Sequence, residues 1–527
     1  LTVAGNLSVD GGTIKLDGNY PVGTGNLALG DAALNGSISG IYNTAIGSFS
    51  MTPLTSGGQN TALGASALRF ITTGSYNTAI GMEALQTNTT ASNSTAVGYQ
   101  ALYTSNAGNS TAVGYQAAKV ATGGAINAFG WQALLSNTSG VENNAFGYQA
   151  LENNTTGGQN TAFGHKALEA NTTASNNTAV GYQAGYSNTT GYSNLALGRG
   201  ALKLNTTATF NTAVGDEAMR QNTTGGSNVA VGTGSMLSNT TGATNTAVGR
   251  NSLFYNTTAS SNTAVGYQAG YVNTTGSDLA LFGYQAGYSN TTAIRTTAFG
   301  RKALYANTTG NDNSALGHDS LVNNTTGASN TAIGRAALYS NTTGIENTAN
   351  GYQALYSNTT ANAHTANGYQ ALFSNTTGVD NTANGYRALY SNTTGGQNTA
   401  IGISALRFNT TASNNTANGW RALFSNTTAS DNVAVGYQAS YTSNSGQNVS
   451  IGYQSMLDTT TGGLNVAMGY RSMYDNTTGA NNVALGHSAL LNNTTASNNT
   501  AVGSLSLYAN TTGSYLTAVG ESALYGN

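Results

Sequence analysis

The chain has 527 residues, a formal net charge of −2 and only 6 % charged residues, against about 25 % in an ordinary globular protein. This composition excludes the basic surface that binding to nucleic acid requires, and no run of about 18 apolar residues is present to cross a membrane. Cysteine is absent, which excludes a disulfide framework. We therefore expect no nucleic-acid partner and no membrane insertion.

The first segment, residues 1–25 (LTVAGNLSVDGGTIKLDGNYPVGTG), alternates apolar and polar residues as β-strands do. It is predicted to be an N-terminal β connector. The chain opens on Leu1 without Met or a signal-peptide pattern, so we expect it to be a piece of a longer protein.

Residues 26–527 form one repeat array. Its landmark is the glycine of an N-T-A-x-G motif, which occurs 30 times from Gly30 to Gly520. Of the 29 intervals between these glycines, 26 are 17 residues long and three are 16 (Gly98 to Gly114, Gly114 to Gly130 and Gly436 to Gly452). A fixed short period is the sequence signature of a solenoid.

Numbered from its leading Asn, the repeat has the consensus N-T-A-V-G-Y-Q-A-L-Y-S-N-T-T-G-x-x. Positions 1–4 alternate and predict a β-strand, whose face at positions 2 and 4 we expect to be buried. The glycine at position 5 predicts a turn with positive φ. Positions 7–11 predict a second short strand, and the N-T-T-G segment a second turn.

Two short strands and two turns in 17 residues predict one coil of a parallel β-solenoid, so the fold class is all-β with about 30 coils of 17 residues. Both faces of the strand carry apolar or small residues, which one narrow coil cannot bury. We therefore predict a homotrimer, with the alanines at positions 3 and 8 facing the partner chains.

The array resembles a known repeat. The segments Asn177–Ala184 (NTAVGYQA) and Ser94–Ala101 (STAVGYQA) are similar to the head repeat of YadA-like trimeric autotransporter adhesins. The longer pattern NTAxGxxALxxNTTG also resembles arrays in phage tail-fibre-like proteins. The resemblance implies a left-handed parallel β-roll, a homotrimer, and attachment to a host surface through a glycan or protein receptor.

Little in the sequence points to catalysis. Three of the four histidines (His165, His318 and His487) fall at position 6 and are expected to point outward, too far apart to share a metal. The densest acidic pair, Asp216–Glu217, has no predicted cleft beside it and is expected to be solvated. No phosphate-binding, dinucleotide or zinc motif occurs, so we expect no enzymatic activity, no metal and no cofactor.

Position 6 carries a broken stripe of aromatic residues. They are expected either to seal the seam between protomers or to contact sugars. The stripe comprises Tyr99, Tyr115, Trp131, Tyr148, Tyr182, Tyr267, Tyr284, Tyr352, Tyr369, Tyr386, Trp420, Tyr437, Tyr453 and Tyr470.

The Asn at position 12 heads an Asn-Thr-Thr or Asn-Thr-Ser triplet in 22 coils. We expect first a turn with a stacked side-chain ladder. The triplet also matches the acceptor pattern for N-glycosylation, and candidate sites include Asn88, Asn154, Asn171, Asn188 and Asn205.

Four coils carry Asn at position 4 in place of Val, Ile or Leu: Asn350, Asn367, Asn384 and Asn418. If position 4 faces inward, stacked amides would form a structural polar ladder. Two alternatives stay open: an Asn-Gly turn pair, or a polar channel if the position faces a threefold axis.

These features predict the shaft of a trimeric fibre, extracellular or on a virion, as in a phage tail fibre or an adhesin. Such a shaft would present a receptor-binding end for surface attachment. A binding module that contacts glycans through the aromatic stripe is the alternative, and an ice-binding solenoid a weaker third possibility.

Overall fold

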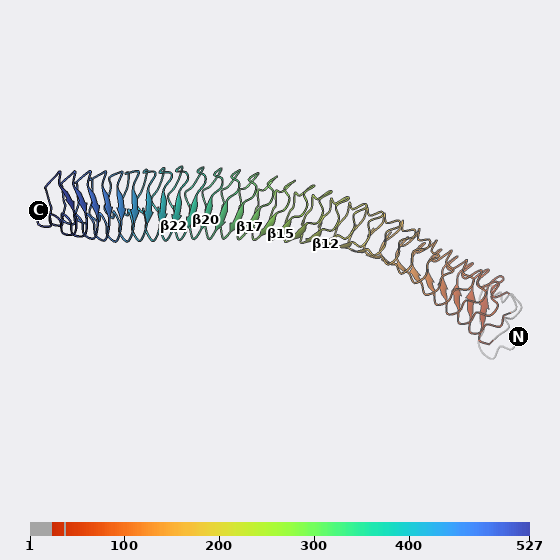
Figure 1. Ribbon diagram of the computed structural model, residues 1–527. Coiled ribbons are helices and arrows are strands. Elements are labelled where there is room, and N and C mark those ends of the chain that lie inside the picture. Colours follow the sequence, from red (N-terminus) through yellow and green to blue (C-terminus); the bar gives the residue numbers. More distant parts are fainter. Residues whose placement is uncertain (1–23, 36–37) are drawn as a thin grey trace, which may run out of the picture. The chain divides into compact units, whose positions relative to one another are not determined.

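The computed structural model describes residues 24–35 and 38–527. It is a parallel β-solenoid of about 29 turns with about 17 residues per turn, and no helix occurs in these two ranges. The predicted fold class and repeat length are thus confirmed (Figure 1). The predicted connector, residues 1–25, lies outside the described residues except for Thr24 and Gly25.

The chain divides into two compact units, Leu1–Ala259 and Ser260–Asn527. The first contains strands β1–β14, each three residues long: β1 (Leu27–Leu29), β2 (Thr44–Ile46), β3 (Thr61–Leu63), β4 (Thr78–Ile80), β5 (Thr95–Val97), β6 (Thr111–Val113), β7 (Asn127–Phe129), β8 (Asn144–Phe146), β9 (Thr161–Phe163), β10 (Thr178–Val180), β11 (Leu195–Leu197), β12 (Thr212–Val214), β13 (Val229–Val231) and β14 (Thr246–Val248).

The second unit contains strands of the same length: β15 (Thr263–Val265), β16 (Ala280–Phe282), β17 (Thr297–Phe299), β18 (Ser314–Leu316), β19 (Thr331–Ile333), β20 (Thr348–Asn350), β21 (Thr365–Asn367), β22 (Thr382–Asn384), β23 (Thr399–Ile401), β24 (Thr416–Asn418), β25 (Val433–Val435), β26 (Val449–Ile451), β27 (Val466–Met468), β28 (Val483–Leu485), β29 (Thr500–Val502) and β30 (Thr517–Val519). Every strand occupies coil positions 2–4.

Within each unit, consecutive strands pair in parallel and in register. In the first unit Ala179 of β10 lies opposite Ala196 of β11, and in the second Asn367 of β21 lies opposite Asn384 of β22. Each coil position therefore stacks on the same position of the next coil. The side chains at any one coil position therefore form a single row along the unit.

The interior of the coil is very narrow. The alanines at positions 3 and 8, such as the completely buried Ala179 and Ala184, lie inside it together with the Leu or Met of position 9, such as Leu151. The prediction that they face partner chains is wrong, because the opposite side of their own coil covers them. In the coil where Leu281 stands at position 3, Gly287 at position 9 makes room, since a Cβ on it would lie 2.7 Å from Leu281 Cδ2.

Positions 2 and 4 point outward. The prediction that this face is buried within the coil is therefore also wrong. Phe163 and Leu197, both at position 4, are 57 % and 41 % exposed. One coil therefore does leave an apolar face uncovered, but this face carries positions 2 and 4 rather than the alanines of positions 3 and 8.

The predicted second strand is absent from the described coils. Positions 7 and 9 adopt left-handed backbone conformations instead, as at Gln183 (φ 55°) and Leu168 (φ 51°). Positions 6–11 therefore form a compact turn.

The predicted glycine turn at position 5 is confirmed. Gly181 has φ 137°, and a Cβ on it would lie 2.5 Å from the carbonyl oxygen of Gly198 in the next coil. Both the backbone conformation and the close approach of the coils therefore require glycine there.

Candidate functional site

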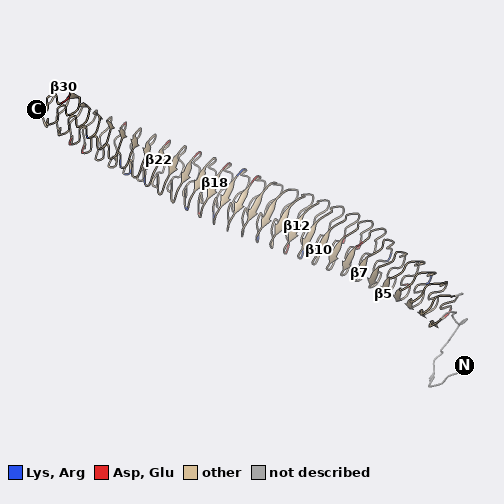
Figure 2. Cartoon of the chain, turned by 60° about the horizontal axis from the view of Figure 1, so that its bottom comes forward, with Lys and Arg blue, Asp and Glu red and all other residues tan. Residues whose placement is uncertain are grey.

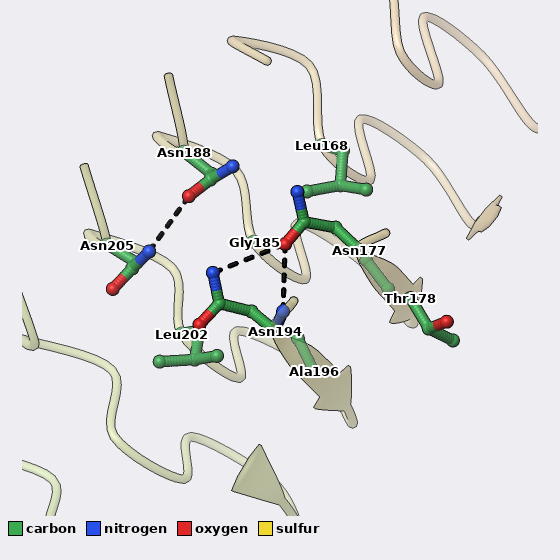
Figure 3. Close-up of a pocket in the computed structure, with 10 residues that line it drawn as sticks. Leu168, Asn177, Thr178, Gly185, Asn188, Asn194, Ala196, Leu202 and Asn205 are labelled. Atoms are coloured by element: carbon green, nitrogen blue, oxygen red, sulfur yellow. Dashed lines mark hydrogen bonds between the residues drawn. The ribbon is translucent and has the colours of Figure 1, made fainter. Parts of the chain in front are cut away.

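Two ladders of asparagine amides run inside each unit. At position 1, Asn177 Oδ1 accepts hydrogen bonds from the backbone N–H of Asn194 (2.9 Å) and from its Nδ2 (3.2 Å), and Asn177 Nδ2 donates to the carbonyl of Gly191 (2.9 Å). Figure 3 shows this pair beside the second ladder. The amides thus satisfy backbone groups that the turns leave without a strand partner.

The second ladder is formed by the Asn at position 12. Nδ2 of Asn205 donates to Oδ1 of Asn188 (2.8 Å) and to the carbonyl of Ala208 (3.1 Å). In the first unit the ladder continues without a break from Asn137 to Asn256. The stacked ladder expected at this position is confirmed.

The same geometry bears on N-glycosylation. All five candidates, Asn88, Asn154, Asn171, Asn188 and Asn205, are at most 2 % exposed, and each Nδ2 donates a hydrogen bond inside the coil. A folded coil therefore does not offer these nitrogens to an enzyme, and the structure argues against modification of the folded chain.

The shorter coils lack the position-12 Asn. Ser105, Ala121 and Ser443 stand there in the three 16-residue coils. In two of these coils the Asn at position 13 does not restore the ladder, but its side-chain oxygen accepts where an ordinary coil uses the position-13 backbone carbonyl: Oδ1 of Asn106 accepts from the N–H of Thr89 (3.0 Å), and Oδ1 of Asn444 from the N–H of Thr427 (3.0 Å). Every 16-residue coil thus lacks the buried amide, although it is also absent from some 17-residue coils, such as those where Leu54, Ile71 and Thr459 stand at position 12.

His364 is the one histidine that the sequence analysis did not place. It stands at position 1, where most coils have Asn, and its side chain is buried. Its Nδ1 accepts a hydrogen bond from the N–H of Asn381 (3.1 Å), as the Asn oxygen does elsewhere, and its Nε2 lies 3.1 Å from Nδ2 of Asn375. Burial lowers the pKa of this imidazole to about 4. His165 and His487, at position 6, are exposed as predicted.

The four Asn at position 4 lie on the outer face. Asn350, Asn384 and Asn418 are exposed and Asn367 is half-buried. Their expected inward orientation is therefore wrong, and no hydrogen bond joins these four side chains to one another in the described strands β20–β24. They interrupt an outward row that elsewhere carries Val, Ile, Leu and Phe.

The aromatic stripe at position 6 forms face-to-face stacks. In the first unit one stack runs from Tyr99 to Tyr182 and includes His165. In the second, one runs from Trp420 to His487 with ring centroids 4.7–5.3 Å apart. Because each ring inside a stack covers its neighbour, only ring edges and hydroxyls point to solvent. Most of the stripe thus lacks the free ring faces that sugars pack against.

A second aromatic row, which the sequence analysis missed, runs along position 10. In the second unit it includes the stacked rings of Tyr356, Phe373 and Tyr390. Arginines at position 7 lie between the two rows, and the guanidinium of Arg387 is 5.2 Å from the Tyr386 ring centroid and 5.3 Å from that of Tyr390. The Tyr that recurs in the A-L-Y-S-N segment of the repeat is the sequence feature that could have predicted this row.

Charged residues are sparse along both units (Figure 2). The Asp216–Glu217 pair lies within a cluster on the turn face of the first unit. The Arg199 guanidinium holds Asp216 through two hydrogen bonds of 2.8 and 2.9 Å and lies 3.3 Å from Glu217 Oε1, and Arg220 reaches the same oxygen at 3.4 Å. Asp216–Glu217 is thus held in ion pairs rather than only solvated.

No group of three or more His, Cys, Asp or Glu side chains among the described residues is arranged to hold a metal ion. No helix there is long and apolar enough to cross a membrane. The small interior cavity drawn in Figure 3, about 10 Å³, lies where Gly185 interrupts the column of Leu168 and Leu202 and is too small for a ligand.

Comparison with known protein families finds no family model that matches the sequence, and no curated protein matches it either.

Proposed function

We propose that this chain is the shaft of a homotrimeric fibre, extracellular or on a virion, that holds a receptor-binding end away from the surface bearing it. The observation that carries this proposal is the outward apolar row at position 4. In the first unit it includes Leu63, Phe163 and Leu197, and in the second Phe299 and Ile333, all 40 % exposed or more. A soluble monomer rarely exposes an apolar row of this length.

Because the position-4 row is regular, we infer that other copies of the same chain pack against it. Equivalent residues recur at every coil, so parallel chains would bring like rows together at each level, as symmetric assembly requires. The proposed kinship with YadA-like head repeats and tail-fibre arrays leads to the same expectation. A solenoid suits a spacer because each added coil lengthens it without altering the fold.

The alternative functions have less support. Stacking occupies most ring faces at position 6, which weakens the idea that the whole stripe binds glycans. An ice-binding surface needs free threonine hydroxyls in flat rows, whereas the Thr at position 13 uses its hydroxyl between coils, as Thr206 Oγ1 does on the carbonyl of Thr223 (3.1 Å).

Sedimentation equilibrium tests the proposal. The wild type should sediment at three times the chain mass of 53.3 kDa. A triple variant at position 4, Val214→Asp, Val231→Asp and Val248→Asp, should shift the protein to monomer, because buried unpaired carboxylates oppose association.

The matched control places three Asp on the same coils at the exposed position 14: Thr224→Asp, Thr241→Asp and Thr258→Asp. It should stay trimeric, and circular dichroism should show the same fold in both variants. A monomeric wild type, or a position-4 variant that remains trimeric, would contradict the proposal.

A further inference from the structure

We propose that the first unit carries a binding site for one carboxylate-bearing sugar residue, on the turn face of the three coils that contain Tyr182, Gly200 and Glu217. A surface cavity of about 250 Å³ lies there. This volume is below the roughly 300–1,000 Å³ of sites for drug-sized ligands, so it suits a single ring. The inference goes beyond the fibre shaft and does not require the trimer.

The cavity exists because a side chain is missing. Position 7 carries Gln183 in the preceding coil and Glu217 in the following one, but Gly200 between them. The nearest atom to a Cβ built on Gly200 is Glu217 Cγ at 3.8 Å, so nothing else fills the space. Gly200 has φ 65°, close to the φ of 55° at Gln183, so the backbone conformation does not demand glycine here.

One wall of the cavity is the end of an aromatic stack. The Tyr182 ring stacks on His165 with centroids 5.3 Å apart, and the next residue in its row is Arg199 rather than another ring. Tyr182 is 51 % exposed, more than any other aromatic residue in this row. Its ring face toward Arg199 is therefore available for the apolar face of a sugar, the contact that interior members of a stack cannot make.

Arg199 does not cover that ring. In the second unit the guanidinium of Arg301 lies over Tyr284 at 6.0 Å and that of Arg335 over Tyr352 at 5.8 Å. Arg199 makes no such contact, because its two hydrogen bonds to Asp216 hold it toward the following coil. The ion pair thus keeps the ring face open.

The charges around the cavity favour an anion. Arg199, Lys203 and Arg220 line it with Glu217, and Asp216 pairs with Arg199 just outside the lining, so the cluster keeps one net positive charge. Glu217 is already paired with both arginines, whereas the Lys203 ammonium forms no ion pair among the described residues. Lys203 is therefore the natural partner of a ligand carboxylate, and the Glu217–Arg220 pair offers an acceptor and donors to sugar hydroxyls.

Titration of the full chain with methyl β-glucuronide, followed by saturation-transfer NMR, tests the inference, with methyl β-glucoside as the neutral probe. We expect saturable binding of the glucuronide in the millimolar range, and binding of the glucoside at least about tenfold weaker, the effect of one charge-assisted contact. Equal binding of both sugars, or no saturable glucuronide binding, would overturn the proposal.

Two variants locate the site. Lys203→Ala should weaken glucuronide binding about tenfold or more, while its matched control Lys119→Ala, at the same coil position away from the cavity, should leave it unchanged. Gly200→Gln restores the side chain that neighbouring coils carry and should fill the cavity without unfolding the coil. Unaltered binding in Gly200→Gln with an unchanged circular dichroism spectrum would also overturn the proposal.

Discussion

Asparagine occupies two opposite environments in this protein, and the contrast shows what organises the coil. At positions 1 and 12 its amide is buried and hydrogen-bonded between coils, as in Asn177 and Asn205. At position 4 the same residue points outward and bonds to no Asn of its own row, as in Asn350 and Asn384. The role of the residue is therefore fixed by its place in the coil, because the interior consists of two polar ladders beside columns of Ala (positions 3 and 8) and of Leu or Met (position 9).

The largest expected effect concerns His364, which replaces the usual buried Asn at position 1. Acid should destabilise the coils around it. Burial lowers its folded-state pKa from 6.5 to about 4, so the unfolded chain binds more protons between these values. The contribution of neutral His364 to the free energy of unfolding is therefore fully present above about pH 6.5. It is lost as the pH drops toward 4, by about 3 kcal/mol at about 1.4 kcal/mol per pKa unit.

Hydrogen exchange measures this effect in the coils around His364. At pH 4 the wild type should lose protection there relative to His364→Asn, which restores the usual ladder residue, and the two proteins should match at pH 7. Equal protection of both proteins at pH 4 would show that the imidazole does not matter for stability.

A smaller loss is expected from cutting the position-12 ladder. Asn205→Ala removes the acceptor of Asn222 Nδ2 and a donor to Asn188 Oδ1, so the free energy of unfolding should fall by about 2 kcal/mol, the usual consequence of buried unpaired polar groups. Asn384→Ala, on the outer face, should change it by no more than about 0.5 kcal/mol. Urea unfolding would compare them, and equal effects would remove the distinction between the two environments.

The smallest effect should come from replacing all four outward asparagines with Val. Asn350, Asn367, Asn384 and Asn418 make no hydrogen bonds with one another, so a melting temperature at or above that of the wild type is expected. Thermal unfolding followed by circular dichroism checks this. A large drop would mean that these amides hold the assembled fibre together.

Much of the fold could be predicted from the sequence. The spacing from Gly30 to Gly520 gives the period, the glycine at position 5 gives a turn, and the N-T-T triplet gives a stacked ladder, though not its burial. These features were accessible because each one depends on local backbone chemistry that repeats in every coil. The aromatic row at position 6 followed from the same regularity.

The direction of the strand faces could not be predicted in the same way. Positions 2 and 4 carry the larger apolar residues, and the usual rule puts such residues inside. The interior is occupied by Ala at positions 3 and 8 and by the Leu or Met of position 9, so Val180 and its equivalents lie outside. The left-handed backbone at Gln183 and Leu168 was equally hidden, because neither residue type marks such a turn. The Gly200 cavity depends on one exception to the repeat, which a consensus conceals.

The most direct test of the fibre proposal is a cryo-EM reconstruction of the assembled protein at side-chain resolution. We predict three parallel chains with the position-2 and position-4 rows, such as Thr246 and Val248, turned toward the common axis, and with the alanines of positions 3 and 8 inside each separate coil. A single chain with these rows in solvent, or an assembly joined through another face, would contradict the account.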